Sequence, residues 1–369
     1  MAVLRLDLNN ILCFNDFSVD FSYPKKLVNS SLQGEYLTNY PHIRYRKVNI
    51  IVGSNASGKT SLGRAIWNIF LFLKDKEANS IFKIVSQSDK KFSILMDCVF
   101  NTGLFFRVEI KKDTQEEDLM VRLRELEMTA DDTYESLVER LDDTKPFENY
   151  VTALEKFSFS GWNFSFPSIE EGFDQINCKY DDSEKAEFCE IYKNVLVTMD
   201  SSIKGVYPSN ELPDSFIIDF NDKDAVAITN KTRLSAIRRL SSGTKYAVNI
   251  AGVIYSIKKH MNGFYFVDEQ FSYVNSDIEI ACLTKMISLL DDGEQLFFTS
   301  HNTELLALPL PNHSFNFIRK IQNQDESRIV WTNAASLEKR NNVNIKNLYD
   351  NDFFGVSPDV NKILNIAEN

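Results

Sequence analysis

A glycine-containing segment at residues 53–60, GSNASGKT, constrains the fold of this chain more than any other feature. It fits the pattern GxxxxGK[ST] and lies between an apolar run that predicts a buried strand and a helical repeat of apolar residues. In that setting the glycines let backbone N–H groups surround phosphate oxygens, and the helix N-terminus adds partial positive charge. The segment therefore predicts a nucleotide-phosphate site. Its expected members are Gly53, Ser54, Asn55, Ala56, Ser57, Gly58, Lys59, Thr60 and Ser61.

Two consecutive acids at the end of a second apolar run extend this prediction. Residues 264–269, FYFVDE, indicate a buried strand that ends in Asp268 and Glu269. Consecutive carboxylates are costly to bury without a cation. We expect Thr60 and Asp268 to bind Mg²⁺ while Lys59 reaches the β- and γ-phosphates of ATP. Glu269 fits the base that polarises the attacking water.

Two shorter motifs accompany these segments. Residues 240–245, LSSGTK, open an apolar helix, where Ser241, Ser242 and Gly243 offer hydroxyl and backbone donors to a phosphate. Residues 295–300, QLFFTS, predict a strand that leads into His301, which can contact the γ-phosphate and hold the water. Taken alone, the first motif is an ordinary helix cap and the second a structural histidine. The order of all four motifs along the chain favours function.

This order resembles the arrangement in ABC ATPases. The chain is similar to the ABC-like AAA ATPases of the ABC/SMC/RecF/OLD superfamily, the branch found in antiphage systems such as Septu, PARIS and some retrons. By this resemblance GSNASGKT is the Walker A motif, LSSGTK the signature, FYFVDE the Walker B motif and TSHN the H-loop. The resemblance implies a Mg²⁺-dependent ATPase in which Ser242 and Gly243 contact the γ-phosphate held by another copy. It therefore implies a homodimer closed around two ATP molecules, and it leaves higher oligomers open.

Several assignments within the resemblance remain open. Residues 272–275 are the D-loop candidate, although the Leu-His of many relatives is missing. Gln87 is a Q-loop candidate and suits a solvated loop equally well. Arg238 and Arg239 either face nucleotide across the dimer or are solvated. For the residue that stacks on adenine, Phe14 and Tyr45 are guesses.

The patterning along the chain divides it into four parts. Residues 1–112 and 213–322 are expected to form the two halves of an ABC-type α/β domain, with three layers, a mixed sheet and a β-hairpin lobe. Residues 113–212 are charged and helix-prone, and we expect a helical insertion or lid there. Residues 323–369 are expected to form a tail that packs on the ATPase domain.

Composition narrows the expected partners and location. A net charge of −11 disfavours a protein that coats DNA non-specifically. No apolar stretch approaches the length of a membrane span, and the chain starts without signal-peptide features, so we expect a cytoplasmic protein without membrane contact.

The expected role follows from what the motifs leave out. The resemblance supplies no nuclease domain after His301, so we expect a defence ATPase that acts as a sensor or scaffold. Such a protein holds and releases a separately encoded nuclease or toxin. The alternative is a RecF- or SMC-like ATPase that acts directly on DNA in repair. A transporter subunit and a degenerate binding module are further, less favoured readings.

Overall fold

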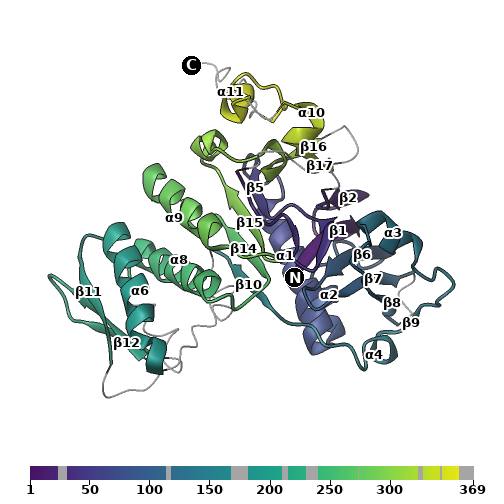
Figure 1. The fold of residues 1–369 in the computed structure, drawn as a ribbon, viewed down its shortest axis with the longest axis horizontal. Coiled ribbons are helices and arrows are strands. Elements are labelled where there is room, and N and C mark those ends of the chain that lie inside the picture. The colour runs from purple at the N-terminus through teal and green to yellow at the C-terminus, as the bar shows by residue number, and fades with distance from the viewer. Residues whose placement is uncertain are drawn as a thin grey trace, which may run out of the picture.

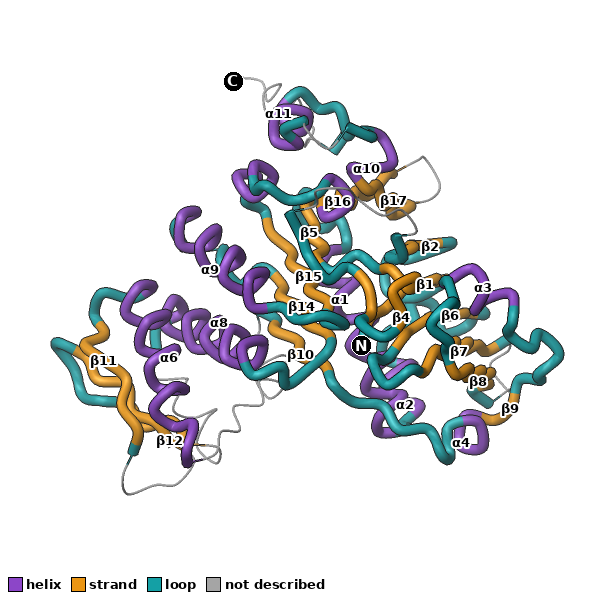
Figure 2. Tube along the Cα trace, viewed as in Figure 1, coloured by secondary structure: helices purple, strands orange, loops and turns teal. Residues whose placement is uncertain are grey.

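The computed structural model describes residues 1–23, 31–113, 118–167, 182–209, 215–229, 240–272, 274–322, 327–340 and 343–356. Two six-stranded sheets stand next to each other, and a three-stranded sheet forms a separate lobe (Figures 1 and 2). A short ribbon is formed by β3 (Tyr36–Leu37) and β4 (Tyr40–Arg44). Within these described ranges, no helix is both long and apolar enough to cross a membrane.

The central sheet has the strand order β10-β14-β15-β5-β16-β17. All neighbours are parallel except β16 and β17. Strands β5, β14 and β15 are buried along their whole length, as expected for a parallel sheet covered on both faces. Their carboxyl ends therefore meet at one edge. The strands are β10 (Trp162–Ser165), β14 (Phe264–Asp268), β15 (Gln295–Ser300), β5 (Val48–Val52), β16 (Phe315–Gln322) and β17 (Ser327–Asn333).

Helices cover both faces of the central sheet, which gives three layers (Figure 1). On one face lies α1 (Lys59–Asp75), whose Phe70 packs edge-on against Phe264 of β14. On the other face lie α8 (Ser242–Lys258) and α9 (Ser276–Leu289). Their Ile250 and Leu283 share a core with Tyr265, which points to the opposite face from Phe264. The short α2 (Ala78–Phe82) follows α1.

The second large sheet is antiparallel and has the order β2-β1-β6-β7-β8-β9. It contains two hairpins, β1 with β2 and β6 with β7, and corresponds to the β-hairpin lobe expected from the sequence. Short helices α3 (Tyr134–Glu139) and α4 (Tyr150–Ala153) belong to this lobe. The strands are β2 (Phe17–Asp20), β1 (Ala2–Asn9), β6 (Phe92–Val99), β7 (Leu104–Lys112), β8 (Met120–Glu127) and β9 (Glu148–Asn149).

A third lobe surrounds the outer side of α8. It consists of the 3₁₀ turn η2 (Asp182–Glu184), α6 (Lys185–Met199) and the sheet of β11 (Ile203–Pro208), β12 (Ser215–Phe220) and β13 (Val226–Thr229). Phe188 of α6 packs against Tyr192, Phe216 and Tyr255, so α6, β12 and α8 share one core. Strands β12 and β13 lie within residues 213–322, which were expected to belong to the ATPase domain, but they pair in this lobe instead of in the central sheet.

The helical insertion expected over residues 113–212 needs correction. Strands β8 and β9 of this region join the antiparallel sheet, and β10 joins the central sheet beside β14. In its described part, α6 is the one helix longer than two turns. The error came from reading charge as helix: residues 120–127, MVRLRELE, have the period-two alternation of a strand. The charges of Arg122 and Arg124 are matched by Glu109 on the neighbouring strand.

The segment after β15 closes the central sheet. It contains two 3₁₀ turns, η3 (Thr303–Ala307) and η4 (Asn312–Ser314), then the hairpin β16–β17 and the helices α10 (Ala334–Leu337) and α11 (Ile345–Asp350). Strand β16 pairs with β17 and also pairs in parallel with β5. The boundary at residue 322 therefore divides a hairpin. Residues 357–369 lie outside the described residues.

Candidate active site

Three of the expected motifs meet at the carboxyl edge of the central sheet. The register aligns Ser300 with Val52 and Asp268 with Thr299, so β5, β14 and β15 end together. The glycine loop follows β5, Glu269 follows β14, and His301 follows β15. Segments more than 200 positions apart in the sequence are thus neighbours.

The glycine loop is tightly built and contains an unsatisfied polar atom. A Cβ at Gly53 would lie 2.3 Å from the carbonyl oxygen of Ile318, and Gly58 has φ 108°, which favours glycine. Ser57 Oγ is buried and has no hydrogen-bond partner among the described residues. A phosphate oxygen would satisfy this hydroxyl. Asn55 and Ala56 are exposed at the top of the loop, and Ser54, Thr60 and Ser61 are half-buried.

Lys59 is folded back onto the loop. Its Nζ donates to the carbonyl oxygens of Gly53 at 2.7 Å and Ser54 at 3.1 Å, and lies 3.3 Å from Glu269 Oε1. Burial lowers the pKa of Lys59, and the nearby Glu269 carboxylate opposes that shift. The ammonium group is therefore held inside the site, where a phosphate group would be its natural counter-charge.

Asp268 is fully buried at the end of β14. Its two carboxylate oxygens accept hydrogen bonds from Thr299 Oγ1 at 2.7 Å and Thr60 Oγ1 at 2.8 Å. Burial raises the pKa of Asp268 to about 6, and the two hydroxyl donors oppose that shift. A carboxylate and a hydroxyl oxygen at this distance are donors that suit Mg²⁺. The residues present therefore fit the metal that the sequence predicted.

Glu269 links the remaining groups. Its Oε1 lies 2.9 Å from His301 Nε2, on the same oxygen that faces Lys59. Its backbone has φ 44°, unusual for a residue with a side chain, and its N–H donates to Thr299 Oγ1 at 3.1 Å. The side chains of Glu269 and His301 are 22% and 38% exposed, so water can reach both. The arrangement can accept a proton from a water molecule near a bound phosphate.

The expected signature residues lie elsewhere. Ser241 caps α8, and Ser242 and Gly243 form its first turn, where helix geometry leaves N–H groups without intrahelical partners. Among the described residues, a Cβ at Gly243 would approach only Ser241 Oγ, at 4.0 Å, so this part of the structure leaves the turn open. Because α8 covers the sheet face opposite α1, these residues are not among those that meet at Lys59.

Other open assignments have different outcomes. Gln87 is exposed between α2 and β6, where its backbone pairs with Asn10, and it makes no described contact with the site. Residues 272–275 connect Glu269 to α9, but Tyr273 lies outside the described residues, as do Arg238 and Arg239. Phe14 and Tyr45 are both fully buried, which makes either a poor platform for adenine.

Sequence reasoning missed three polar residues that organise the site. Thr299 forms hydrogen bonds with both Asp268 and Glu269. Its position two residues before His301 was the sequence feature that could have identified it. Gln270 Nε2 donates to the Asp268 carbonyl oxygen, and Gln270 Oε1 accepts from Asn249 of α8. Glu279 of α9 contacts the loop that carries His301. No periodicity marks Glu279, because its partners lie on another element.

Comparisons with known proteins agree with this architecture. The chain matches the structure of an Smc head bound to the C-winged helix domain of ScpA, with TM-score 0.53 and 13% identity, over 92% of this chain and 100% of that one. It also matches an Smc head domain with an extended coiled coil, bound to the C-terminal domain of ScpA, from Pyrococcus furiosus, with TM-score 0.50 and 12% identity, over 90% and 97% of the two chains. No protein-family model matches the sequence, and comparison with curated proteins gives no match. The likeness shows the fold, so the predicted ABC-type α/β architecture is confirmed.

Proposed function

We propose that this chain is a Mg²⁺-dependent ATPase that hydrolyses ATP in a site shared between two copies. The observation that carries the proposal is the meeting of Lys59, Glu269 and His301 around one carboxylate oxygen at the end of the glycine loop. ATP is the substrate that fits a glycine loop, a buried lysine and a water-accessible carboxylate in this order.

The reaction follows from the positions of these groups. The oxygen of a water molecule forms a bond to the γ-phosphorus while the bond to the β–γ bridging oxygen breaks, and ADP leaves with that electron pair. The proton of the water passes to the Glu269 carboxylate, which His301 orients through the 2.9 Å contact. Lys59 turns from the loop carbonyls to the phosphates and stabilises the charge that develops there. Mg²⁺, held by Thr60 and Asp268, would add charge neutralisation at the phosphates.

The proposal of a dimer rests on α8. To enclose the γ-phosphate, a site needs hydrogen-bond donors opposite the glycine loop as well as on it. The chain's own α8 cannot supply them, because it covers the face of the central sheet opposite α1. Its open first turn at Gly243 suits a phosphate presented by another copy. Two copies related by a two-fold axis would complete two such sites at once.

The test of this activity is phosphate release from ATP and Mg²⁺ by the purified chain, compared with Glu269→Gln. We expect steady turnover by the wild type, and a Glu269→Gln variant that still binds ATP while its turnover falls by about a hundredfold or more. A wild type that binds ATP without releasing phosphate, or a variant as active as the wild type, would contradict the assignment.

We further propose that the ATPase is a cytoplasmic sensor or scaffold of an antiphage system, which holds and releases a separately encoded nuclease or toxin. Both matched Smc heads were solved in complex with a domain of ScpA, so proteins of this fold dock a partner polypeptide. The resemblance to defence ATPases supplies the biological setting.

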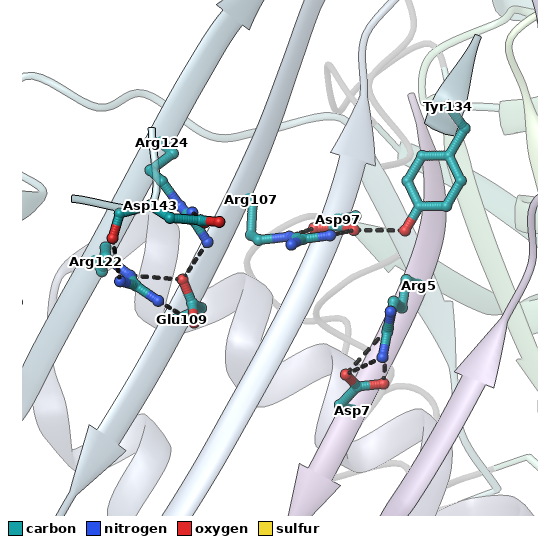
Figure 3. Close-up of polar contacts among 9 residues, drawn as sticks. All are labelled: Arg5, Asp7, Asp97, Arg107, Glu109, Arg122, Arg124, Tyr134 and Asp143. Carbon is teal, nitrogen blue, oxygen red and sulfur yellow. Dashed lines mark hydrogen bonds and ion pairs between the residues drawn. The ribbon is translucent and has the colours of Figure 1, made fainter. Parts of the chain in front are cut away.

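Direct action on DNA is the alternative, and the charges of the antiparallel lobe weigh against it. Four arginines of this sheet form ion pairs with carboxylates of the same lobe, so they do not present free positive charge to DNA phosphates (Figure 3). Arg107 and Arg124 are buried, and the local charge is balanced. The pairs are Arg5 with Asp7, Arg107 with Asp97, Arg122 with Glu109, and Arg124 with Glu109 and Asp143.

Co-purification from the native operon separates these two roles. Wild type and Glu269→Gln are isolated with and without ATP. A neighbouring protein whose retention changes with nucleotide or with the substitution supports the scaffold. An ATPase that comes out alone and retains DNA in the ATP-bound variant would replace the scaffold with the DNA-repair role.

A further inference from the structure

Glu279 is a buried carboxylate that the catalytic scheme has not used. It lies on α9 with 4% of its surface exposed. One oxygen accepts from Ser300 Oγ at 2.6 Å, and the other accepts from Asn302 Nδ2 at 2.8 Å. These donors flank His301 in the sequence, and the Asn302 N–H also donates to Ser300 Oγ at 2.9 Å. The carboxylate thus fixes the loop on both sides of His301.

The same helix is attached to Glu269. The chain leaves Glu269, passes through residues 270–275 and enters α9 at Asn275, whose side chain caps the helix. Four positions beyond this cap, Glu279 reaches back to the His301 loop. The contact between His301 Nε2 and Glu269 Oε1 therefore closes a ring of structure: α9 is hydrogen-bonded to the His301 loop through Glu279, and the chain joins α9 to Glu269.

From this ring we infer that Glu279 is a positioning residue for ATP hydrolysis, holding His301 in register with Glu269. Burying a carboxylate is costly unless its oxygens are paired, and here both oxygens are paired to the His301 loop. Charge-assisted bonds of this kind are short and directional, which suits the fixing of a backbone. Burial raises the pKa of Glu279, and the two donors oppose that shift by favouring the charged form. The inference rests on the proposed ATPase activity.

The test compares Glu279→Gln and Glu279→Ala, each alone and combined with His301→Ala. Glutamine has one acceptor oxygen and an NH2 group in place of the second oxygen, so it can keep one of the two bonds that Glu279 accepts. Alanine keeps neither bond. We expect kcat for ATP to fall by about three- to tenfold in Glu279→Gln and by about ten- to a hundredfold in Glu279→Ala, with KM changed by less than about twofold. In the His301→Ala background we expect neither substitution to lower kcat further.

Leu283→Ala is the matched control, since Leu283 is buried on the same helix in the core beneath the sheet. It should lower thermal stability without lowering kcat. An equal fold-loss from Glu279→Gln in both His301 backgrounds would overturn the inference, as would unchanged kcat or a loss confined to KM. If Glu279→Ala does not fold, Glu279→Gln decides. Absence of turnover in the wild type would instead reject the ATPase itself, so the two failures are distinguishable.

Discussion

At the residue scale, the site depends on Thr299 as much as on the acids that the sequence makes obvious. Thr299 Oγ1 donates to Asp268 Oδ1 and accepts from the Glu269 N–H. The second of these bonds helps to hold Glu269 at φ 44°, a conformation that costs free energy for a side-chain residue. A single hydroxyl therefore supports both Asp268, the proposed Mg²⁺ ligand, and Glu269, the proposed base.

We expect Thr299→Val, which keeps the shape and removes the hydroxyl, to lower the free energy of unfolding by about 1–3 kcal/mol, because it leaves a buried carboxylate oxygen without its donor. It should also lower kcat about tenfold or more by releasing Glu269. Urea denaturation and phosphate release measure the two effects. The control is Thr198→Val on the exposed surface of α6, where neither value should change appreciably. Equal unfolding free energies and equal kcat values for the two variants would show that Thr299 supports neither Asp268 nor Glu269.

Asp132 provides a pH-dependent prediction remote from the site. Its burial would raise its pKa, but the ion pair with Arg140 and the hydrogen bonds from Thr129 lower it to about 2. The folded-state pKa lies below the ordinary value of 3.8, so this stabilisation is present above about pH 4 and is lost as the pH falls toward 2. Because the Arg140 side chain is 43% exposed, solvent screening reduces this contribution to about 1 kcal/mol.

The measurement is the free energy of unfolding of wild type and Asp132→Asn between pH 6 and pH 2.5. The variant should be less stable at pH 6, and the two proteins should converge as the pH falls. A difference that is constant over the whole range would show that Asp132 contributes no charge-dependent stability.

At the scale of elements, the first turn of α8 is where a substitution should affect ATP turnover without affecting folding. The described residues leave space where a side chain at Gly243 would project, and Ser241 supplies the cap. We expect Gly243→Glu to fold normally, because a carboxylate near a helix N-terminus is favourable. In a dimer it would repel the γ-phosphate of the other copy, so ATP binding should persist while turnover is lost.

Gly243→Ala is the uncharged comparison, since its methyl group adds a little bulk at the same position and no charge. Circular dichroism and ATP binding should be close to wild type for Gly243→Ala, and its phosphate release should fall much less than that of Gly243→Glu. Only phosphate release should fail for Gly243→Glu. Full activity of the glutamate variant would exclude this turn from the site.

Local patterns predicted some elements well and others poorly. The apolar repeat from Leu62 to Leu73 predicts α1, and the apolar run before Gly53 predicts β5. In both elements the pattern of apolar residues along the segment itself matches the buried positions. By contrast, β10 is four residues long and is determined by its pairing with β14. The role of Glu279 likewise depends on Ser300 and Asn302, which its own helix does not encode. The periodicity of apolar residues within one segment cannot predict contacts of this kind, because they depend on residues far away in the sequence.

At the scale of the whole molecule, the structure separates the two halves of the proposed site. The glycine loop, Glu269 and His301 lie at the carboxyl edge of the central sheet, whereas α8 joins the lobe of α6 and β12 (Figure 1). Asn249 and Gln270 connect that lobe to β14 by a buried hydrogen bond of 3.2 Å. Closure of the proposed dimer on ATP would therefore act on both lobes of each copy.

The most direct test of this shared site is turnover in a mixture of two inactive variants, Glu269→Gln and Gly243→Glu. Each variant alone should release almost no phosphate. A mixed dimer has one intact site, made of the glycine loop and Glu269 from one copy and the α8 turn from the other. An equimolar mixture should recover about a quarter of wild-type turnover, since about half of the dimers are mixed and each retains one of two sites. No recovery, despite ATP binding by both variants and dimers in solution, would contradict a site shared between two copies.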